Sequence, residues 1–370
     1  MRVVMFYQSL ISDWNHGNAH FLRGIASELL VHGHHVEIFE PEESWSVANL
    51  LAEYGEPKLN EFRVAYPQLS SHRFDLNKID FDEILHDADL VIVHEWNDPE
   101  LIRDIGIHRR LLNFKLLFHD THHRLATQHS KRLPFDLKDY DGVLAYGKVI
   151  RDLYLREGWA QYAWIWHEAA DVRVFHPMPE IERTADLVWI GNWGDDERTN
   201  ELQEFLISPV KRLQLMSSVF GVRYPAEAKA ALAAAGIDYC GWLPNFRVPE
   251  VFARFRVTVH IPRRPYATLL PGIPTIRPFE ALACGIPLVC SPWVDTEGLF
   301  KPHDFLIAKS GPHMEKLISQ VLNDPAMAQE LALNGLSTIL ERHTCSHRVD
   351  ELLRIYSEIA SPAERPLAIV

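Results

Sequence analysis

The chain lacks any uninterrupted apolar run of the roughly 18–20 residues that a membrane-spanning helix needs. Its first residues, MRVVMFYQSL, are followed at once by polar ones, which predicts a first strand rather than a signal peptide. Low-complexity tracts and solenoid repeats are missing as well, and the four cysteines have no metal-ligand spacing. These absences favour a cytoplasmic globular protein whose cysteines are reduced and belong to the core.

An excess of positive charge is also lacking. The chain has 37 Lys and Arg against 50 Asp and Glu, which gives a net charge of −13. This balance argues against nucleic acid as a partner, because binding to phosphate backbones depends on basic surfaces. The 370 residues exceed one ordinary domain, so two domains are expected.

Short β-rich runs alternate with segments of helical period, a pattern typical of parallel sheets with crossover helices. Strands are predicted at 3–7, 35–39, 90–94, 115–118 and 142–145, and again at 187–191, 214–218, 238–241, 257–261 and 288–291. Helices are predicted at 19–31, 313–322, 326–340 and 346–359. The two sets predict a first domain over 1–172, a proline-containing linker over 173–185 and a second domain over 186–345. The segment 346–370 is expected to pack back on the first domain.

The stretch TIRPFEALACGIPLV, residues 275–289, predicts a short helix with Pro278 at its first position. The unpaired N–H groups and the dipole at such a helix start form an anion site, here supplemented by Thr275 and Arg277. Glu280 is expected in the first turn. Its carboxylate either accepts hydrogen bonds from a hydroxylated ligand or caps the helix, and the residues alone leave both open.

Several segments in order resemble one family: WHEAADVRVFHP, LVWIGNWGDDERT, YCGWLPN, RPFEALACGIPLV and RHTCSHRVDELL. Together with the opening strand and helix they are similar to GT-B glycosyltransferases of the retaining family-four group. The nearer likeness is to spore-maturation-type proteins among the glycosyl transferases of group 1. This resemblance covers most of the chain and implies an α/β protein of two Rossmann-like domains that face each other across a cleft.

The resemblance implies that the second domain holds a nucleotide diphosphate sugar, with Glu280 on the ribose hydroxyls. It gives Arg198 the task of neutralising the departing phosphates; the alternative is a solvated charge at a helix end. Trp242 and Leu243 resemble the loop that flanks the base, and Trp242 is equally readable as a core residue. Arg263, and its neighbour Arg264, are further candidates for phosphate contacts.

The family pattern has two glutamates separated by seven residues, and the position paired with Glu280 is Gly272. No acid replaces it, so contacts to the donor sugar are expected from backbone groups of Leu270–Thr275. Gly272, Thr275, Ile276 and Arg277 are all expected to lie at the donor. This departure leaves the identity of the donor sugar open.

In the first domain, His119 follows a predicted strand and matches a histidine near the sugar and the attacking hydroxyl. Other residues compete for this role or belong to the same site: His122, His123, His94 and Glu95. Gly17 and Asn18 open the first helix; they either face the diphosphate and the acceptor or form an N-cap. The run HDTHH also invites a metal site, but no known ligand spacing supports one, so neither a metal nor a cofactor is expected.

The expected reaction is transfer of the donor sugar to a hydroxyl acceptor, with retention implied by the resemblance and domain closure excluding water. The acceptor stays open among a polysaccharide, a lipid-linked hydroxyl and a protein hydroxyl, with peripheral membrane contact also open. A basic segment at 108–132 either binds an anionic acceptor or is a solvated helix face. Its basic residues are Arg109, Arg110, Lys115, Arg124, Lys131 and Arg132.

Three other functions compete with this reading. An NAD-dependent oxidoreductase is disfavoured, because no G-x-G-x-x-G follows the first strand. A GT-B epimerase or phosphorylase stays open. So does a non-catalytic protein that binds sugar nucleotides, for which the missing acid at Gly272 is the main argument.

Overall fold

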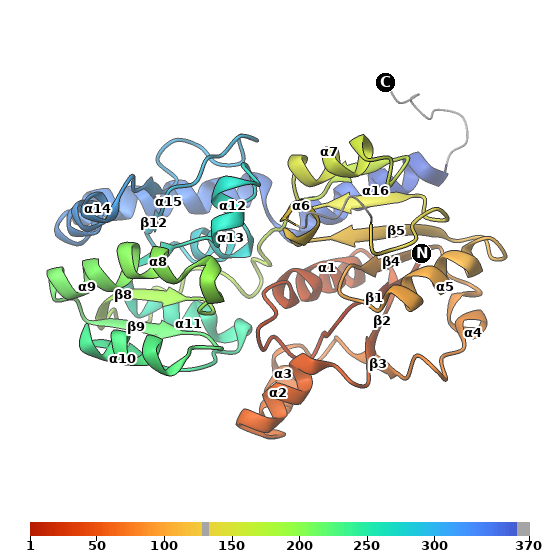
Figure 1. Ribbon diagram of the computed structural model, residues 1–370, viewed down its shortest axis with the longest axis horizontal. Helices are drawn as coiled ribbons and strands as arrows, with labels where there is room; N and C mark the ends of the chain where they lie inside the picture. Colours follow the sequence, from red (N-terminus) through yellow and green to blue (C-terminus); the bar gives the residue numbers. More distant parts are fainter. Residues whose placement is uncertain (128–132, 361–370) are drawn as a thin grey trace. The chain divides into compact units, whose positions relative to one another are not determined.

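The computed structural model describes residues 1–127 and 133–360 and divides the chain into two compact units. The first unit contains Met1–His167 and the chain from Cys345 onward, and the second contains Glu168–Thr344 (Figure 1). The segment 173–185, expected to be a linker, lies in the second unit, where Phe175 is fully buried in a hydrophobic cluster.

The first unit is built on a seven-stranded parallel sheet with the strand order β3-β2-β1-β4-β5-β6-β7. The strands are β1 (Arg2–Phe6), β2 (His35–Pro41), β3 (Ser71–Phe74), β4 (Leu90–His94), β5 (Lys115–Asp120), β6 (Gly142–Ala145) and β7 (Ala163–Ile165). The helices are α1 (Ala19–Val31), α2 (Trp45–Tyr54), α3 (Pro57–Ala65), α4 (Phe81–Leu85), α5 (Pro99–Arg109), α6 (Arg124–Thr127), α7 (Lys148–Arg156) and α16 (Cys345–Ala360). The C-terminal helix α16 packs against α1, which brings the two ends of the chain into one unit.

The central strands of this sheet are apolar because both faces are covered. All five residues of β4 are buried, as expected for a strand in a parallel sheet enclosed by helices. The register pairs His94 of β4 with His119 of β5, so both strands deliver polar side chains to the same carboxyl edge. Ligands of open parallel sheets bind outside this edge.

The second unit has a six-stranded parallel sheet with the order β10-β9-β8-β11-β12-β13. The strands are β8 (Ala185–Ile190), β9 (Ser217–Phe220), β10 (Ile237–Tyr239), β11 (Phe255–His260), β12 (Leu288–Cys290) and β13 (Leu306–Ile307). The α-helices are α8 (Thr199–Leu202), α9 (Ser208–Leu213), α10 (Ala226–Ala234), α11 (Val248–Ala253), α12 (Arg264–Thr268), α13 (Ile276–Ala283), α14 (Gly311–Asn323) and α15 (Pro325–Arg342). Shorter helical turns are η1 (Asp195–Glu197), η2 (Gln203–Ile207) and η3 (Asn245–Arg247).

Two hydrophobic clusters cover the opposite faces of this second sheet. Leu187 and Trp189 of β8 belong to one cluster, and Val188 and Ile190 belong to the other. This division follows from the alternation of side chains along a strand. Each unit is therefore an α/β layer structure of the Rossmann-like kind, and the predicted fold class is confirmed at this level.

Most predicted elements are present, with shifts of a few residues at their ends. The helix predicted at 19–31 has these bounds in the structure, and Gly33 follows it with a φ of 77°. The strand predicted at 214–218 begins only at Ser217, because Gln214 ends α9 in a left-handed conformation. The missed strands β3, β7 and β13 are short, and the polar sequence of β3 hides it from periodicity.

Two findings bear on the expectations from composition. Among the described helices, none combines the length and the apolar character that crossing a membrane requires. All four cysteines are free, and Cys284, Cys290 and Cys345 are buried as expected. Cys240 is exposed, so the expectation of a core position is wrong for this residue.

Candidate functional site

The helix α13 begins at the carboxyl edge of the second sheet with an unusual backbone conformation. Its N-cap residue Thr275 has φ 61° and ψ 178°, a region that is costly for a β-branched residue. The helix starts at Ile276, so Pro278 is its third residue and the prediction of Pro278 at the first position is wrong. The helix therefore begins two residues earlier than predicted. Its first main-chain N–H groups are those of Ile276 and Arg277.

Glu280 lies past the first turn of α13 and is fully buried. Its carboxylate accepts a hydrogen bond of 2.8 Å from the Asn245 side-chain amide and forms an ion pair with Arg277. Both a first-turn position and a capping role for Glu280 are therefore wrong. The carboxylate orients Arg277 and ties α13 to the turn η3, which contains Asn245.

A second buried carboxyl group, Glu168, belongs to the same electrostatic neighbourhood. It is 4% exposed. Burial, and then the nearby charge of Glu280, raise its pKa to about 8, against an opposing effect of Arg277. Sequence reasoning missed Glu168, although it lies within the motif WHEAAD that was noted only for its family likeness.

Arg198 is held by main-chain oxygens rather than by a carboxylate. Its guanidinium donates to the carbonyl oxygens of Ile261 (3.0 Å) and Asn192 (2.5 Å) and lies over the Trp189 ring. Burial and the charge of Arg263 lower its pKa to about 10. Arg198 is therefore a half-buried cation after β8 that main-chain hydrogen bonds hold in place, rather than a fully solvated charge at a helix end.

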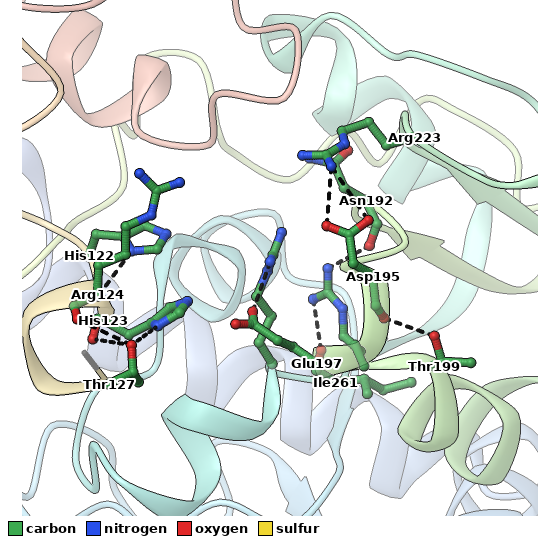
Figure 2. A network of polar contacts seen from close by, with 12 residues as sticks. His122, His123, Arg124, Thr127, Asn192, Asp195, Glu197, Thr199, Arg223 and Ile261 are labelled. Carbon is green, nitrogen blue, oxygen red and sulfur yellow. Dashed lines mark hydrogen bonds and ion pairs between the residues drawn. The ribbon is translucent and has the colours of Figure 1, made fainter. Parts of the chain in front are cut away.

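The loop that carries Arg198 is braced by the loop after β9. Asn192 accepts a hydrogen bond from the main chain of Val222 (3.0 Å), and Asp195 accepts one from Arg223 (3.2 Å), as Figure 2 shows for Asn192, Asp195 and Arg223. At Gly221, which has a φ of 153°, an added Cβ would lie 2.1 Å from the Gly191 carbonyl oxygen. Only glycine permits this approach of the two loops.

His260 ends β11 and connects the strand edge to the start of α13. Its ring contacts the Thr275 hydroxyl at 3.4 Å and the Cys290 sulfur at 3.2 Å. Burial and the charges of Arg198 and Arg277 lower its pKa to about 3, so the imidazole is neutral. Sequence reasoning missed His260, although a histidine at the carboxyl end of a predicted strand is the signal that would have found it.

The two adjacent arginines after β11 have different surroundings. Arg263 pairs with Glu197 at 2.9 Å, and its charge acts on Arg198. Arg264 starts α12 and forms a two-pronged pair with Glu201 at 2.8 and 3.1 Å, with 45% of its side chain exposed. Of the two, Arg263 therefore belongs with the cation group at this edge.

Arg198, Arg263 and Arg277 together make this edge of the second unit electropositive. Arg263 and Arg277 both lower the pKa of Arg198, and Arg198 and Arg277 both lower that of His260, so each of the three lies within electrostatic reach of this group. Two of them are partly neutralised by Glu197 and Glu280, whereas Arg198 has only main-chain hydrogen-bond partners among the described residues. Guanidinium groups beside a helix start are suited to bind a phosphate or diphosphate.

Gly272 has a φ of 90° and no room for a side chain. An added Cβ would lie 2.6 Å from the Thr296 hydroxyl and 2.9 Å from the Glu297 side chain. Its main chain donates to the Val294 carbonyl, which fixes the loop before α13. Trp242 and Leu243 are half-buried; Leu243 packs on a hydrophobic cluster, and Trp242 is not one of the fully buried core residues.

His119 of the first unit is enclosed rather than exposed at the sheet edge. It has no exposed surface and donates to or accepts from the Tyr7 hydroxyl at 2.7 Å. The rings of Phe21, His94 and Trp166 pack around it. Burial lowers its pKa to about 3, so the ring is neutral near neutral pH, and no part of it is accessible to a ligand.

Thr121, which directly follows β5, is the centre of a hydrogen-bonded group of side chains. Glu95 accepts from the main chain and hydroxyl of Thr121 at 2.9 and 3.1 Å. His94, which is fully buried, lies 3.0 Å from the same hydroxyl, and Asn18 donates to it. Asn18 is the N-cap of α1, but its side chain makes no capping bond, and Gly17 beside it is exposed.

His122 and Arg124 lie further along this loop. The Arg124 main chain donates to the His122 ring at 3.2 Å, and the His123 ring contacts the Thr127 hydroxyl at 3.3 Å (Figure 2). The Arg124 side chain is exposed, and its guanidinium carbon lies 4.2 Å from the centre of the Trp96 ring.

The basic segment predicted at 108–132 does not form one surface. Arg109 pairs with Asp141 at 3.1 Å, and Arg110 forms two bonds of 2.6 Å with Asp139. These arginines lie at the end of α5, near the start of β5, whereas Arg124 follows the end of β5. The acidic residues that neutralise the pair follow later in the chain, so a local charge count could not show them. Lys131 and Arg132 lie outside the described residues.

Comparison with known families and structures supports these observations. Residues 198–354 match the model of a family described as glycosyl transferase-like. Among curated protein sequences, none matches the chain. Sucrose-phosphate synthase from Thermosynechococcus elongatus superposes with a TM-score of 0.64 at 14% identity, covering 98% of this chain and 100% of that one.

Two further structures carry ligands. HepE of Anabaena, in complex with UDP and glucose, has a TM-score of 0.63 at 14% identity over 96% of this chain and 99% of that one. An α-glucosyltransferase in complex with UDP and DNA has a TM-score of 0.67 at 12% identity, with the same two shares covered. The superposed structures show that the chain has the two-domain GT-B fold of these glycosyltransferases, and the glycosyl transferase-like family model matches less than half of the chain. The resemblance inferred from the sequence motifs is confirmed, while the nearer likeness to spore-maturation-type proteins stays a prediction.

Proposed function

We propose that the protein transfers a sugar from a nucleotide diphosphate sugar to a hydroxyl acceptor, and that the arginines of the second unit bind the diphosphate. The observation that carries this proposal is Arg198. It is a half-buried cation whose hydrogen bonds among the described residues go to main-chain carbonyls, so its charge is left for a ligand. A fixed cation stabilises the negative charge that develops on a departing diphosphate.

The other groups have roles that follow from their surroundings. Arg277, fixed by Glu280 at the start of α13, binds a second phosphate oxygen together with the helix N–H groups. Arg263 supplies additional positive charge, and neutral His260 holds Thr275 in its strained conformation. Direct contact of Glu280 with ribose stays a prediction, as do base contacts by Trp242 and Leu243 and contacts of Ile276 with the donor.

UDP is the first nucleotide to test, because the HepE and α-glucosyltransferase structures both contain it. We further propose retention of configuration, with a phosphate oxygen of the donor taking the proton of the acceptor hydroxyl. Arginines supply the charge that a metal ion provides elsewhere, so the proposed reaction needs neither a metal nor a cofactor. A cytoplasmic location stays a prediction.

The proposed acceptor is a hydroxyl of a saccharide, a lipid-linked group or a protein rather than nucleic acid. The α-glucosyltransferase structure contains DNA, but the net charge of −13 in this chain disfavours a polyanion. His119 has no exposed surface. We therefore propose that the histidine near the attacking hydroxyl is one in the loop after β5, His122 or His123.

Calorimetry with UDP, GDP, ADP, dTDP and CDP and their sugar conjugates tests the proposal, followed by donor hydrolysis for each ligand that binds. We expect selective binding of one nucleotide with slow hydrolysis of its sugar conjugate. Arg198→Ala should weaken binding and hydrolysis, while Arg212→Ala, which removes an exposed arginine paired with Glu315, should change neither. Binding without hydrolysis or transfer would favour the non-catalytic alternative. Release of a changed sugar nucleotide without an acceptor would favour an epimerase, and a requirement for inorganic phosphate would favour a phosphorylase.

A further inference from the structure

Three side chains of the first unit form a mixed aromatic and cationic surface after β4 and β5. The Arg124 guanidinium stacks over the Trp96 ring at 4.2 Å, and the His122 ring meets Trp96 edge-on, with centres 5.3 Å apart. Figure 2 shows His122 and Arg124 side by side on one loop. Trp96 and His122 are half-buried and Arg124 is exposed, so the group is accessible to a ligand.

Arg124 differs from Arg109 and Arg110 in forming no ion pair with a carboxylate among the described residues, while its charge acts on Glu95 over a longer distance. Arg109 and Arg110 are paired with Asp141 and Asp139. Arg124 instead rests on an indole ring, which restricts its side chain without neutralising its charge. A guanidinium held in this way is prepared for a two-pronged contact with a phosphate or carboxylate.

Next to these side chains lie two carboxyl groups, half-buried Glu95 and buried Asp120. Glu95 and Asp120 lie close enough to hydrogen-bond, and Asp120 also accepts from the Tyr154 hydroxyl (2.8 Å) and the His122 main chain (3.0 Å). Burial, and then the charge of Asp120, raise the pKa of Glu95 well above its usual range. The charge of Arg124 acts in the opposite direction on this pKa. The net upward shift favours the neutral form of Glu95, which reduces the negative charge near Arg124.

We propose that Trp96, His122 and Arg124 bind an anionic group, a phosphate or a carboxylate, on a saccharide acceptor. Arg124 contacts the anion, His122 adds a hydrogen-bond donor, and the accessible part of the Trp96 ring packs against C–H groups of the sugar. A single unpaired arginine fits one anionic group rather than a polyanion. This inference rests on the proposed glycosyltransferase function and names the class of its acceptor.

The test is calorimetry on the full-length protein with UDP at saturation, so that the arginines of the second unit are occupied. The probes are glucose 6-phosphate, glucuronate and glucose. We expect one anionic sugar to bind measurably better than glucose, and Arg124→Ala to weaken it by about 10- to 100-fold. Arg124→Lys should recover part of the loss, because lysine keeps the charge but not the planar fork.

Arg156→Ala is the matched control, since it also removes an exposed arginine of the first unit, whose ion-pair partner among the described residues is Glu157. It should leave anion binding unchanged. Trp96→Phe should weaken binding less than Arg124→Ala. Flotation with vesicles that contain phosphatidylinositol separates the sources: Arg124-dependent flotation assigns the anionic group to a lipid headgroup, and Arg124-dependent binding of soluble sugars alone assigns it to a soluble acceptor.

Equal binding of the anionic sugars by Arg124→Ala and the unaltered protein would overturn the proposal, as would no preference for either over glucose. UDP affinity is measured on the same samples. If Arg124→Ala binds UDP normally and loses the anionic sugar, both proposals stand. If UDP binds to none of the proteins, the proposed function fails. The titrations with the anionic sugars are then repeated without UDP on an Arg198→Ala background. Whether their binding depends on Arg124 still shows whether this surface binds an anion.

Discussion

Arg277 and Glu280 form an ion pair within α13 in which the carboxylate is completely buried and the arginine side chain is 18% exposed. The buried partner cannot reach solvent, so its effect is exerted through the partly exposed one. Asn245 secures the other oxygen of the carboxylate. The pair thus sets the direction of a cation at the start of a helix, where an anion is expected to bind.

Replacing Glu280 should therefore affect both stability and nucleotide binding. Glu280→Ala leaves the half-buried Arg277 guanidinium and the buried Asn245 amide without their partner and should lower the free energy of unfolding by about 3–5 kcal/mol. UDP affinity of the folded fraction should fall as well, because Arg277 loses its orientation. Denaturant unfolding and calorimetry measure the two effects separately.

Glu250→Ala is the control for this experiment, because Glu250 forms an exposed pair with Arg247 at the same spacing of three residues. Its loss should cost less than about 1 kcal/mol. Unchanged UDP affinity in folded Glu280→Ala would show that the carboxylate has only a structural role.

Arg198→Lys tests whether position or charge matters at this residue. Lysine keeps a positive charge but cannot make both carbonyl contacts and the stack on Trp189 at once. We expect donor hydrolysis to fall by about 100- to 1000-fold in kcat, with a smaller change in KM, as for loss of a group that acts on developing charge. Steady-state kinetics with the best donor measures both constants. A change in KM with an unchanged kcat would contradict this prediction.

Gly272→Ala should destabilise the second unit through its backbone and its contacts. The φ of 90° is unfavourable for alanine, and the new Cβ would collide with Thr296 and Glu297. The expected loss is about 1–3 kcal/mol, measured by denaturant unfolding. Gly236→Ala is a matched control with a φ of 74° and no atoms within 4 Å of an added Cβ, so it should cost less. By the same argument, Gly272→Glu should not improve donor binding, and a gain in affinity would contradict the steric account.

Glu168 should give the protein a stability component that weakens in alkaline solution. Its folded pKa of about 8 exceeds the ordinary value of 4.5, so the folded protein holds a proton that the unfolded chain releases between these values. The component is fully present below the ordinary pKa and is lost as the pH rises through about 8. Glu168→Gln cannot ionise, so its melting temperature should fall less than that of the unaltered protein between about pH 5.5 and about pH 8.5.

Glu180→Gln, which changes an exposed carboxylate of the same segment, should behave like the unaltered protein. Identical pH dependence in Glu168→Gln and the unaltered protein would mean that Glu168 is ionised in the folded state throughout this range.

The fold was accessible from the sequence because its signals are local. Buried parallel strands appear as short apolar runs, such as 90–94. The helical spacing of apolar residues and the position of Gly33 predict the length of α1. Motif order along the chain then indicated the family, and the family model and the superposed structures agree with it. Polar edge strands such as β3 escaped, because no hydrophobic period distinguishes them.

Site residues were only partly accessible for the same reason. Arg198, Arg263 and Arg277 could be named because each lies in or next to a recognisable strand, helix or motif. Their partners could not be predicted, because these partners are main-chain atoms or lie far away in the sequence. The pairs are Glu280 with Asn245, Arg198 with the carbonyl oxygens of residues 192 and 261, and Arg110 with Asp139.

The sequence by itself determined the strand and helix order, the two-part organisation and the family likeness, since these depend on neighbouring residues and on motif order. Only the tertiary structure decided that His119 is enclosed and that Glu280 is buried against Arg277. It also decided that Arg124 stacks on Trp96 while Arg109 and Arg110 form ion pairs with aspartates. Burial and charge pairing depend on which residues meet across strands and loops, and folding alone brings those residues together.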